Sequence, residues 1–530
     1  MATVPLPTEI LRRAPQGTFH NEPFTDFKAP ENHRKMHEAL ELVGTQLGRE
    51  YPLILGGHRS KTDGKIRSLD PSRPSRVVGV HQKAGAEHAE QAMRAAIRAF
   101  ELWSRASNGE RTSLLLGAAE IIRKRKFEFC AWLTYEVGKN WAEADADVGE
   151  TIDFLEFYAR EALRLAEART PIQLPGEKDE LRYIPLGVGA VIPPWNFPFA
   201  IMAGMTSAAI VTGNTVILKP SSDSPTIAAK FIEVLEEAGM PGGVVNFCPG
   251  SGAAFGNAIV EHPKTRFIAF TGSKSVGLEI HERAAKARPG QIWIKRTILE
   301  MGGKDSILVC ADTELDTAIA GVVASAFGFS GQKCSACSRA IVEASIYDAF
   351  VDGLRERVGE LTVGDPAENH NLGPVVNKAA MDTILGYIAK GKEEGRLVAG
   401  GHAIETEGGG YYLEPTVFAD IAPDAVIAQE EIFGPVLAVI KVDDFKEALK
   451  VANNTEYGLT GAVYTDDRER LDTARQEFHV GNLYLNRKCT GAMVGAHPFG
   501  GFNMSGTDSK AGGPDYLLLF TQAKSIAEKL

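Results

Sequence analysis

A cysteine at position 334 stands where a helical pattern ends at a glycine-bearing turn. The stretch from Phe327 to Arg339 holds both Cys334 and Cys337. A thiol on such a turn can be reached by substrate and can act as a nucleophile toward a carbonyl carbon. Two other interpretations remain open, because most cysteines simply pack in cores and because Cys334 and Cys337 have the spacing of a redox or metal pair. The redox or metal pair is a weak interpretation, because a zinc site needs four ligands and no second cysteine pair or histidine cluster has suitable spacing.

Two further polar residues have the chemistry that a cysteine nucleophile needs. Glu300 ends a predicted strand, 34 residues before Cys334, where a carboxylate can act as a general base that activates water. Asn196 follows two prolines and a tryptophan, which predict a rigid loop that presents an amide donor to a developing oxyanion. Taken singly, Glu300 is also typical of a solvated charge and Asn196 of a turn cap.

A turn that suits a pyrophosphate lies between Phe270 and Gly277. It follows a predicted strand and opens a predicted helix, so free backbone N–H groups and the positive end of the helix would face an anion. By contrast, the stretch from Gly250 to Gly256 is one residue longer than the usual dinucleotide fingerprint. We therefore expect no standard phosphate loop at the second stretch.

The elements that must position these residues follow from the hydrophobic spacing. Three amphipathic segments, at about 84–106, 111–137 and 141–167, are predicted to be surface helices. A period-two stretch with a turn-like centre, residues 170–186, predicts a projecting hairpin. Strands and helices then alternate from 187 to 300 and again from about 312 to 486, which predicts two α/β domains with parallel sheets.

The first alternating run has expected strands at 188–193, 215–219, 244–247, 266–270 and 292–299, and expected helices at 226–238, 253–261 and 276–287. In the second run the expected helices are 318–327, 346–361 and 379–394. Both runs have the strand and helix lengths that right-handed crossovers require.

The composition of the 530 residues excludes several functional classes. Hydrophobic residues make up 44% and charged residues 24%, which allows a substantial core. The net charge of −11, with no long basic run, argues against nucleic acid or an anionic membrane as a partner. No apolar run reaches the length of a membrane span, and residues 1–27 lack a signal pattern. Six irregularly spaced cysteines fit reduced thiols, so we expect a cytoplasmic protein.

These motifs, in this order, resemble the aldehyde dehydrogenase superfamily. Stretches at 430–436, 453–459 and 498–501 are similar to later signatures of that family, so the resemblance covers nearly the whole chain. It implies an α/β aldehyde dehydrogenase-like fold with two Rossmann-like parallel-sheet domains and a β-hairpin oligomerisation flap. The implied boundaries are 1–169 and 188–299 for a cofactor-binding domain, 300–512 for a catalytic domain, and 170–187 with 513–530 for the flap.

The resemblance also implies a role for each matching residue. Cys334 is the nucleophile, Glu300 is the base for thioester hydrolysis, and Asn196 with the Cys334 backbone N–H forms the oxyanion hole. The implied reaction passes a hydride from an aldehyde to a nicotinamide cofactor and releases an acid. The implied cofactor-binding residues are Ile192, Pro193, Trp195, Lys219, Ser222, Gly252, Gly256, Phe270, Gly272, Ser273, Val276, Glu431 and Phe433, and no metal is expected.

Within the superfamily, residues 51–57, 193–194, 219–225 and 486–494 resemble the 1-pyrroline-5-carboxylate dehydrogenases. That branch oxidises L-glutamate γ-semialdehyde to glutamate in proline catabolism, so the expected substrate is a small aldehyde with an α-amine and an α-carboxylate. The implied substrate-binding residues are Phe199, Lys333, Ser335, Gly491, Ala492 and Phe499. Two alternatives stay open: a dehydrogenase for another semialdehyde or for a broad range of aldehydes, and a catalytically silent structural or binding protein on this fold.

One departure from the family pattern bears on the cofactor. Many NAD-preferring relatives carry a glutamate three residues after the ribose-binding lysine, where this chain has Ser222. Without that negative charge a 2′-phosphate is not repelled, so we expect NAD to be used and NADP to be tolerated. The resemblance further implies a homo-oligomer, either a dimer or an assembly of dimers.

Overall fold

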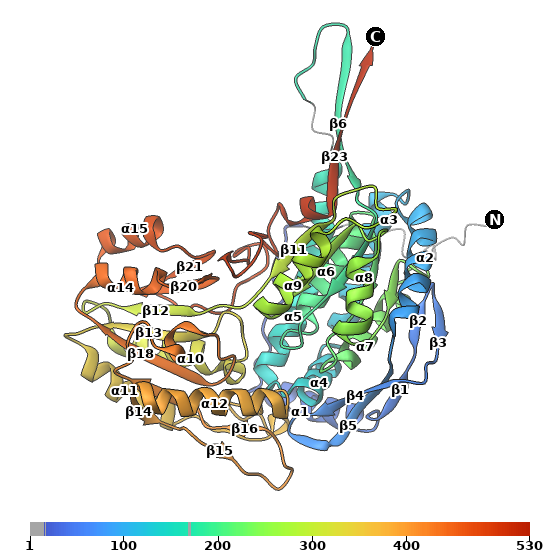
Figure 1. Ribbon diagram of the computed structural model, residues 1–530. Helices are drawn as coiled ribbons and strands as arrows, with labels where there is room; N and C mark the ends of the chain where they lie inside the picture. The colour runs from blue at the N-terminus through green and yellow to red at the C-terminus, as the bar shows by residue number, and fades with distance from the viewer. Residues whose placement is uncertain (1–14, 16, 168–170) are drawn as a thin grey trace.

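The computed structural model describes residues 15, 17–167 and 171–530. Two seven-stranded sheets, each with helices on both faces, form the body of the molecule, and a two-stranded ribbon projects from it (Figure 1). Within these residues, no helix combines the length and the apolar character that crossing a bilayer requires.

The first sheet has the strand order β11-β10-β7-β8-β9-β2-β3. Its bounds are β2 Leu53–Leu55, β3 His58–Ser60, β7 Val188–Ile192, β8 Thr215–Leu218, β9 Val245–Phe247, β10 Phe267–Thr271 and β11 Arg296–Glu300. The five strands from β7 to β11 are parallel, and short apolar runs buried on both faces are typical of such strands. Their register places Phe270 beside Ile192, and Thr271 beside Glu300, so these strand ends meet at one edge of the sheet.

The crossovers of the first sheet include one helix that the hydrophobic spacing did not predict. Helix α6, Ala200–Val211, joins β7 to β8 and is buried on nearly every side, so its sequence lacks the one-sided apolar pattern of a surface helix. The others are α7 Pro225–Glu237, α8 Asn257–Glu261 after a π-helical turn Gly252–Gly256, and α9 Lys274–Ala285. The strand expected at 292–299 begins only at Arg296, because residues 292–295 form a loop that exposes Ile292 and Ile294.

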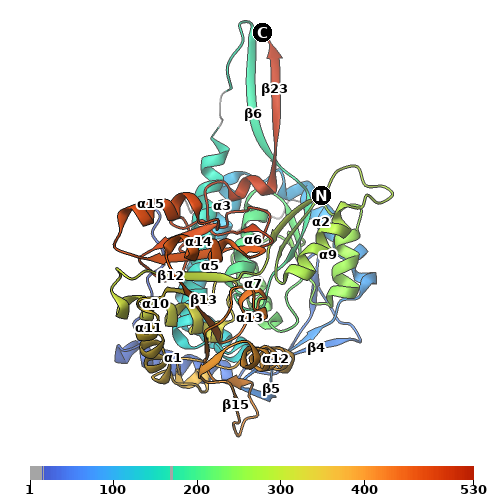
Figure 2. The same cartoon turned by 60° about the vertical axis from the view of Figure 1, so that its left-hand side comes forward.

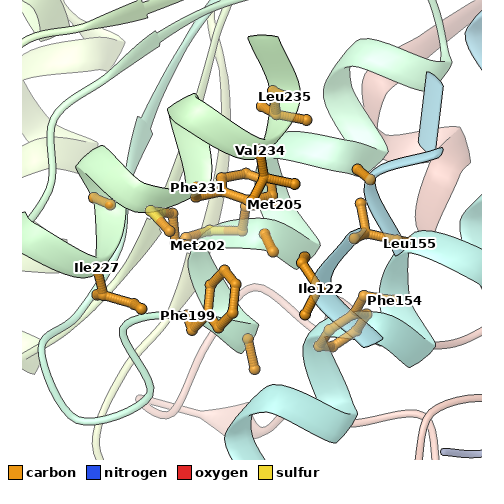
Figure 3. Close-up of a cluster of buried hydrophobic side chains, with 14 of the residues drawn as sticks. Ile122, Phe154, Leu155, Phe199, Met202, Met205, Ile227, Phe231, Val234 and Leu235 are labelled. Carbon is orange, nitrogen blue, oxygen red and sulfur yellow. The ribbon is translucent and has the colours of Figure 1, made fainter. Parts of the chain in front are cut away.

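The N-terminal helices are α1 Pro30–Gly44, α2 Ala86–Trp103, α3 Asn108–Lys124, α4 Lys126–Val137 and α5 Trp141–Ala166. The single helix predicted over 111–137 is wrong, since the backbone leaves helical geometry at Arg125 between α3 and α4. The prediction of surface helices is confirmed for α2, which buries one face only, but it is wrong for α4 and α5, which are mostly buried. Figure 3 shows side chains of α3, α5, α6 and α7 meeting in one apolar core.

The second sheet has the order β14-β17-β18-β13-β12-β20-β21, and only its edge strand β14 runs antiparallel. The bounds are β12 Asp305–Val309, β13 Cys337–Glu343, β14 Arg396–Ala399, β17 Thr416–Ala419, β18 Val436–Val442, β20 Thr460–Tyr464 and β21 Asn482–Leu485. Its helices are α10 Leu315–Phe327, α11 Tyr347–Gly359, α12 Lys378–Glu394, α13 Val426–Gln429, α14 Phe445–Asn453 and α15 Arg468–Glu477. The three helices expected in this run are therefore present within three residues at each end.

The projecting ribbon is made by two distant segments. Strand β6, Glu177–Pro185, pairs antiparallel with β23, Thr521–Lys529, and both views show the two strands side by side (Figures 1 and 2). The hairpin expected within 170–186 is therefore wrong as a local structure, because the described residues 171–176 form no strand there; Thr170 lies outside the described residues. The expectation that this stretch joins the chain's end is confirmed.

The remaining strands form small sheets at the periphery. A three-stranded sheet contains β1 Arg49–Tyr51, β4 Lys65–Asp70 and β5 Arg73–Gln82, and short pairs are formed by β15 Ala403–Ile404 with β16 Tyr412–Leu413 and by β19 Tyr457–Gly458 with β22 Phe502–Asn503. The β19–β22 pair brings the segment after β21 back toward the first sheet, where Gly506 bridges to Glu300.

Candidate active site

A cavity of about 530 Å³ lies where α5, the start of α6, the end of β11 and the turn after α10 converge. Cys334 and Glu300 both line it, together with a loop that follows β21. Glu300 is the last residue of β11 in the first sheet, whereas Cys334 precedes β13 in the second sheet. The two residues that the sequence singled out for covalent chemistry therefore come from different sheets and face one enclosed space.

The turn before Cys334 has an unusual backbone. Phe329, Ser330 and Gly331 have φ values of 50°, 54° and 68°, which is the left-handed region that side chains other than glycine rarely adopt. A Cβ on Gly331 would lie 2.2 Å from the Gly434 carbonyl oxygen, so only glycine fits there. After α10 ends at Phe327 and Gly328 leaves helical geometry, three successive left-handed residues turn the chain toward Cys334.

Gln332 holds this turn in place and is a residue that sequence reasoning missed. Its side-chain amide donates to the carbonyl oxygens of Phe329 (3.3 Å) and Pro374 (3.2 Å), and its side-chain oxygen accepts from the Val376 N–H (2.8 Å). The side chain is fully buried. Because all three bonds are shielded from water, they tie the nucleophile turn to the segment before α12.

The two groups proposed for covalent chemistry are both protonated more readily than usual. Burial raises the pKa of the Cys334 thiol well above its ordinary value, and the negative charges of Asp305 and Glu300 add to the effect. Burial also raises the pKa of Glu300 to about 7, although a hydrogen bond from Ser509 Oγ (3.2 Å) opposes that rise. A carboxyl group with a pKa near neutrality is suited to exchange protons with a thiol or with water. The interpretation of Glu300 as a solvated charge is wrong, since the residue is buried.

Asn196 is hydrogen-bonded to the turn that carries Cys334. Its Nδ2 donates to the backbone carbonyl of Gln332 at 3.0 Å, two residues before Cys334, and the side chain is buried. One N–H of the amide is therefore fixed by the protein and the other is available. Among the described residues, no acceptor is bonded to the Cys334 backbone N–H either. This arrangement supplies two neighbouring donors for an oxygen that becomes negative on a carbon bonded to Cys334.

A buried ion pair anchors the loop that carries Asn196. Lys139 and Asp147 lie 3.0 Å apart with both side chains fully buried, and the Asp147 carboxylate also accepts from the Ala200 N–H. The Lys139 ammonium is 3.9 Å from the centre of the Phe197 ring. These contacts orient Phe197 toward the cavity, which it lines.

The expectation that Phe199 walls the substrate site is wrong. Phe199 is fully buried and packs against Phe129 and Phe231 in the core of Figure 3. It caps the N-terminus of α6, and two residues along a helical path point about 200° apart, so Phe197 and Phe199 face opposite ways. Phe197 takes the cavity position instead.

The other residues expected to bind substrate all line the cavity: Lys333, Ser335, Gly491, Ala492 and Phe499. Lys333 is not a free cation, since its ammonium lies 2.7 Å from the Glu143 carboxylate. The backbone N–H groups of Gly491 and Ala492 have no acceptor in the part of the chain that the structure describes. Two free amides and a hydroxyl therefore stand within one cavity as donors for an anionic group.

Glu150 is a second cavity residue that sequence reasoning missed. It comes from α5, lines the same cavity as Cys334, and accepts no hydrogen bond from another described residue. Loss of contact with bulk water raises its pKa to about 8, and the nearby Asp147 carboxylate adds to that rise. An uncompensated carboxyl group in an enclosed site is a partner for a cationic group of a ligand. Its position in an amphipathic helix, far from every motif, gave no signal.

The alternative that Cys334 and Cys337 form a redox pair is not favoured by the geometry. All six cysteines are free thiols, and Cys337 is buried at the start of β13. The side chain that contacts Cys337 is Cys489, from the loop after β21, and not Cys334. Cys334 is alone among the three in lining the cavity.

The residues expected to bind the cofactor gather at the carboxyl ends of the first sheet. Lys219 follows β8, where its amine donates to the carbonyl oxygens of Pro220 (3.1 Å) and Gly250 (3.2 Å), and burial lowers its pKa to about 8. Ser222 lies exposed in the next turn. Ile192 ends β7 and pairs with Phe270, the second-last residue of β10, and Gly256 lies beside Lys219. A crevice outside the carboxyl ends of parallel strands is where α/β sheets bind ligands.

The start of α9 has the features of a diphosphate site. Ser273 precedes the helix without a capping side-chain bond, and the next three N–H groups have no acceptor among the described residues. Gly272 and Gly277 are required by packing, because a Cβ would lie 2.5 Å from the Phe270 ring at the first and 2.4 Å from Met301 Sδ at the second. Val276 is largely exposed in this first turn, and Gly252 faces open space. These residues fit a dinucleotide that bears two phosphates.

Glu431 and Phe433 lie on the other side of the nucleophile turn from the large cavity. Both line a small hollow with Gly303 and Lys333, and the Glu431 carboxylate accepts from the Gly303 N–H at 3.0 Å. Burial raises the pKa of Glu431 to about 7. Phe433, with φ 58°, packs edge-on against Trp195, which follows Pro193 and Pro194 in the Asn196 loop. Polar and aromatic groups thus flank the turn opposite the cavity.

The comparisons with known proteins agree with this arrangement. The model of the aldehyde dehydrogenase family matches residues 58–526. A 1-pyrroline-5-carboxylate dehydrogenase of Geobacillus thermodenitrificans is 57% identical over 511 residues, which cover 96% of this chain and 99% of the relative.

Solved structures show the same relationship. A 1-pyrroline-5-carboxylate dehydrogenase from Thermus with bound NAD superposes with a TM-score of 0.96 at 52% identity, covering 97% of this chain and 99% of the Thermus chain. Lactaldehyde dehydrogenase from Escherichia coli superposes with a TM-score of 0.86 at 33% identity, covering 91% and 100%. On the extent of the family match and on these relatives, the chain belongs to the aldehyde dehydrogenase family.

Proposed function

We propose that the chain oxidises L-glutamate γ-semialdehyde, the open form of 1-pyrroline-5-carboxylate, to L-glutamate with NAD. The observation that carries this proposal is one cavity that contains a cysteine, a buried base, free backbone donors and an uncompensated carboxyl group. The relatives named for 1-pyrroline-5-carboxylate, over nearly their full lengths, support the same substrate. The reaction belongs to proline catabolism.

The chemistry is divided among residues of this chain. Cys334 Sγ bonds to the aldehyde carbon, and the resulting oxyanion accepts hydrogen bonds from Asn196 Nδ2 and the Cys334 N–H. Bound NAD would supply the hydride acceptor, so that loss of hydride from this carbon would leave a thioester on Cys334. Glu300 then removes a proton from a water molecule, whose oxygen bonds to the thioester carbon. The C–S bond breaks, which restores the thiolate and releases the acid.

NAD fits the groups at the carboxyl ends of the first sheet. Lys219 would hold a ribose, the open N-terminus of α9 with Ser273 would hold the diphosphate, and Glu431 with Phe433 would meet the nicotinamide end. Trp195 belongs to the same loop as Asn196 and packs against Phe433. The same loop therefore serves both the cofactor and the oxyanion. These assignments are supported by the unpaired N–H groups at the start of α9 and by the similarity to a solved relative with bound NAD.

The far end of the substrate is recognised by charge. Its carboxylate accepts from the N–H groups of Gly491 and Ala492 and from Ser335, while its ammonium pairs with Glu150. Phe197 and Phe499 wall the aliphatic middle. A hydrogen bond to a charged group contributes about 1.5–3 kcal/mol, so substrates without the carboxylate lose a large part of their binding.

A panel of aldehydes tests this function. Wild-type enzyme is expected to use glutamate γ-semialdehyde at least about tenfold better, in kcat/KM, than butanal, because the latter lacks both charged groups. Cys334→Ser should remove oxidation of every aldehyde while NAD binding, measured by fluorescence titration, is retained. Equal use of butanal and the semialdehyde would refute the substrate and leave the alternative of a broad aldehyde dehydrogenase. Oxidation by Cys334→Ser at a substantial fraction of the wild-type rate would refute the mechanism.

We also propose a homo-oligomer, a dimer or an assembly of dimers, in which the β6–β23 ribbon contacts a second copy. The ribbon extends from the body as two strands, of which β23 has mostly exposed and β6 mostly half-buried side chains, and an isolated pair of strands is marginally stable in water. A neighbouring subunit would supply the missing cover. A cytoplasmic location is also proposed. The six free thiols support a reducing compartment.

A further inference from the structure

One guanidinium bonds two carbonyl oxygens of the loop after β21. Arg487 Nη2 donates to two carbonyl oxygens of the same loop, those of Thr490 and Gly491, each at 3.1 Å. The guanidinium lies over the ring of Tyr484 at 4.5 Å, and its other terminal nitrogen is 3.5 Å from His497 Nε2. Arg487 is therefore clamped between the end of β21 and residues further along the loop, and it cannot reorient without releasing both carbonyls.

The positions of these two carbonyls determine where two N–H groups point. The peptide bonds are trans, so the N–H of Gly491 points away from the Thr490 carbonyl, and the N–H of Ala492 points away from the Gly491 carbonyl. Because both carbonyls converge on one nitrogen of Arg487, both N–H groups aim away from the guanidinium. Gly491 adopts φ 79°, the left-handed conformation that produces successive N–H groups facing an anion.

The two N–H groups have no acceptor among the described residues, and both residues line the cavity that contains Cys334. Lys333, the nearest cation beside the nucleophile, is already paired with Glu143 at 2.7 Å. Lys488 also lines this end of the cavity, beside Gly491, so an anion there would meet a cation and the backbone donors that the loop presents.

We propose that Arg487 is a positioning residue for carboxylate recognition: it holds the Thr490 and Gly491 carbonyls so that the two following N–H groups are fixed as donors to the substrate carboxylate. The inference rests on the proposed function. It assigns to Arg487 an effect through the backbone, because a guanidinium has five N–H donors in a planar fork, whereas a lysine ammonium presents a single compact centre.

Two substitutions separate position from charge. Arg487→Ala removes the clamp and the charge, whereas Arg487→Lys keeps the charge but loses the planar guanidinium, which lies over Tyr484 and contacts His497 while Nη2 bonds both carbonyls. Both variants are expected to raise KM for glutamate γ-semialdehyde by about tenfold or more, since one hydrogen bond to a charged group accounts for at least one factor of ten. For butanal, which has no carboxylate, kcat/KM should stay within about twofold of the wild type. Arg355→Lys is the matched control, because Arg355 is an exposed arginine of α11 that does not line the cavity.

A binding measurement adds a readout that does not depend on turnover. Calorimetric titration should give weaker binding of L-glutamate to both Arg487 variants and unchanged binding of NAD relative to the wild type. Recovery of the wild-type KM in Arg487→Lys would overturn the inference in favour of charge alone, and an equal loss with butanal would overturn it in favour of general loop structure. If Arg487→Ala does not fold, as judged by circular dichroism, the lysine variant still decides. If the wild type does not oxidise the semialdehyde, the proposed function itself is wrong. If the wild type oxidises it and the Arg487 variants have the wild-type KM, only this inference is wrong.

Discussion

Glu300 and Cys334 face the same cavity, and each is protonated more readily than its ordinary chemistry would suggest. Burial is the main cause in both cases, and it acts against the charged form that each needs for reaction. The cost of forming the thiolate is offset when a neighbouring carboxylate accepts the proton. A base with a pKa of about 7 is well matched to this task near neutral pH.

The pKa of Glu300 predicts how activity depends on pH. Only the carboxylate form is a base, so kcat is expected to rise as pH increases through about 7 and then to level off. Ser509→Ala removes the hydrogen bond that lowers this pKa, so the midpoint of the rise should move to higher pH. Steady-state rates across pH measure both the rise and its shift.

Glu300→Gln should lose this rise and show a first-turnover burst of reduced cofactor. A Glu300→Gln variant whose rate still rises through pH 7 would contradict the assignment.

Ser222 predicts the choice between the two nicotinamide dinucleotides. The exposed turn after Lys219 has a hydroxyl at this position, and the adjacent Asp223 carboxylate is engaged by the Asn377 amide at 3.1 Å. A glutamate at position 222 would repel a 2′-phosphate, so Ser222→Glu is expected to lower kcat/KM for NADP by at least about tenfold with little change for NAD. Initial rates with both cofactors measure this. Wild-type discrimination above roughly a thousandfold would show that another residue already excludes NADP.

At the scale of the elements, the reactive turn depends on a small number of buried bonds. The chain leaves α10 through three left-handed residues, and Gln332 bonds this turn to residues 374 and 376 while its carbonyl holds Asn196. A local sequence could not maintain such a conformation alone, because two of the three residues carry side chains. The nucleophile and the oxyanion donor therefore share one support.

Gln332→Met tests that support. The substitution keeps the volume but removes three hydrogen bonds and leaves buried backbone groups unpaired, so the free energy of unfolding is expected to fall by about 2–4 kcal/mol. Urea denaturation measures the loss, and kcat should fall more than KM changes because the Asn196 contact is disturbed. Gln91→Met, on the exposed face of α2, is the control and should change stability by less than about 0.5 kcal/mol. Equal stabilities of the two variants would show that the turn does not depend on Gln332.

At the scale of the whole molecule, the reaction centre joins the two sheets. Residues 301–304 carry the chain directly from Glu300 in the first sheet to β12 in the second, and Gly506 bridges back to Glu300. The separation of base and nucleophile is thus set by how the two sheets pack. The β6–β23 ribbon, by contrast, projects from the body, and none of its residues lines the cavity (Figure 1).

Removal of residues 522–530 tests the role of the ribbon. The deletion takes away β23 and leaves β6 without a partner, while the cavity residues are untouched. The truncated chain is expected to sediment as a smaller species than the full chain, because the exposed strands no longer present a paired surface to a second copy. Far-ultraviolet circular dichroism controls for folding of the body. An unchanged sedimentation coefficient in a folded sample would exclude the ribbon as the contact.

The sequence by itself determined the class of fold and predicted the candidate reactive residues. Cys334, Glu300 and Asn196 lie in short motifs whose residue types carry their own chemistry, and buried parallel strands have short apolar runs that are visible without tertiary information. The period of the hydrophobic residues likewise located most crossover helices. It failed at α6, where burial on nearly all sides removes the period.

Only the tertiary structure decided which distant residues complete the site. Glu150 and Arg487 lie far along the chain from Cys334 and enter its surroundings because α5 and the loop after β21 pack against the reactive turn. Phe197 rather than Phe199 reaches the cavity because the chain turns into a helix between them. The partner of β6 is β23, at the opposite end of the chain. Hydrophobic spacing reports on neighbours within a few residues, whereas these contacts are set by packing between elements that are distant along the chain.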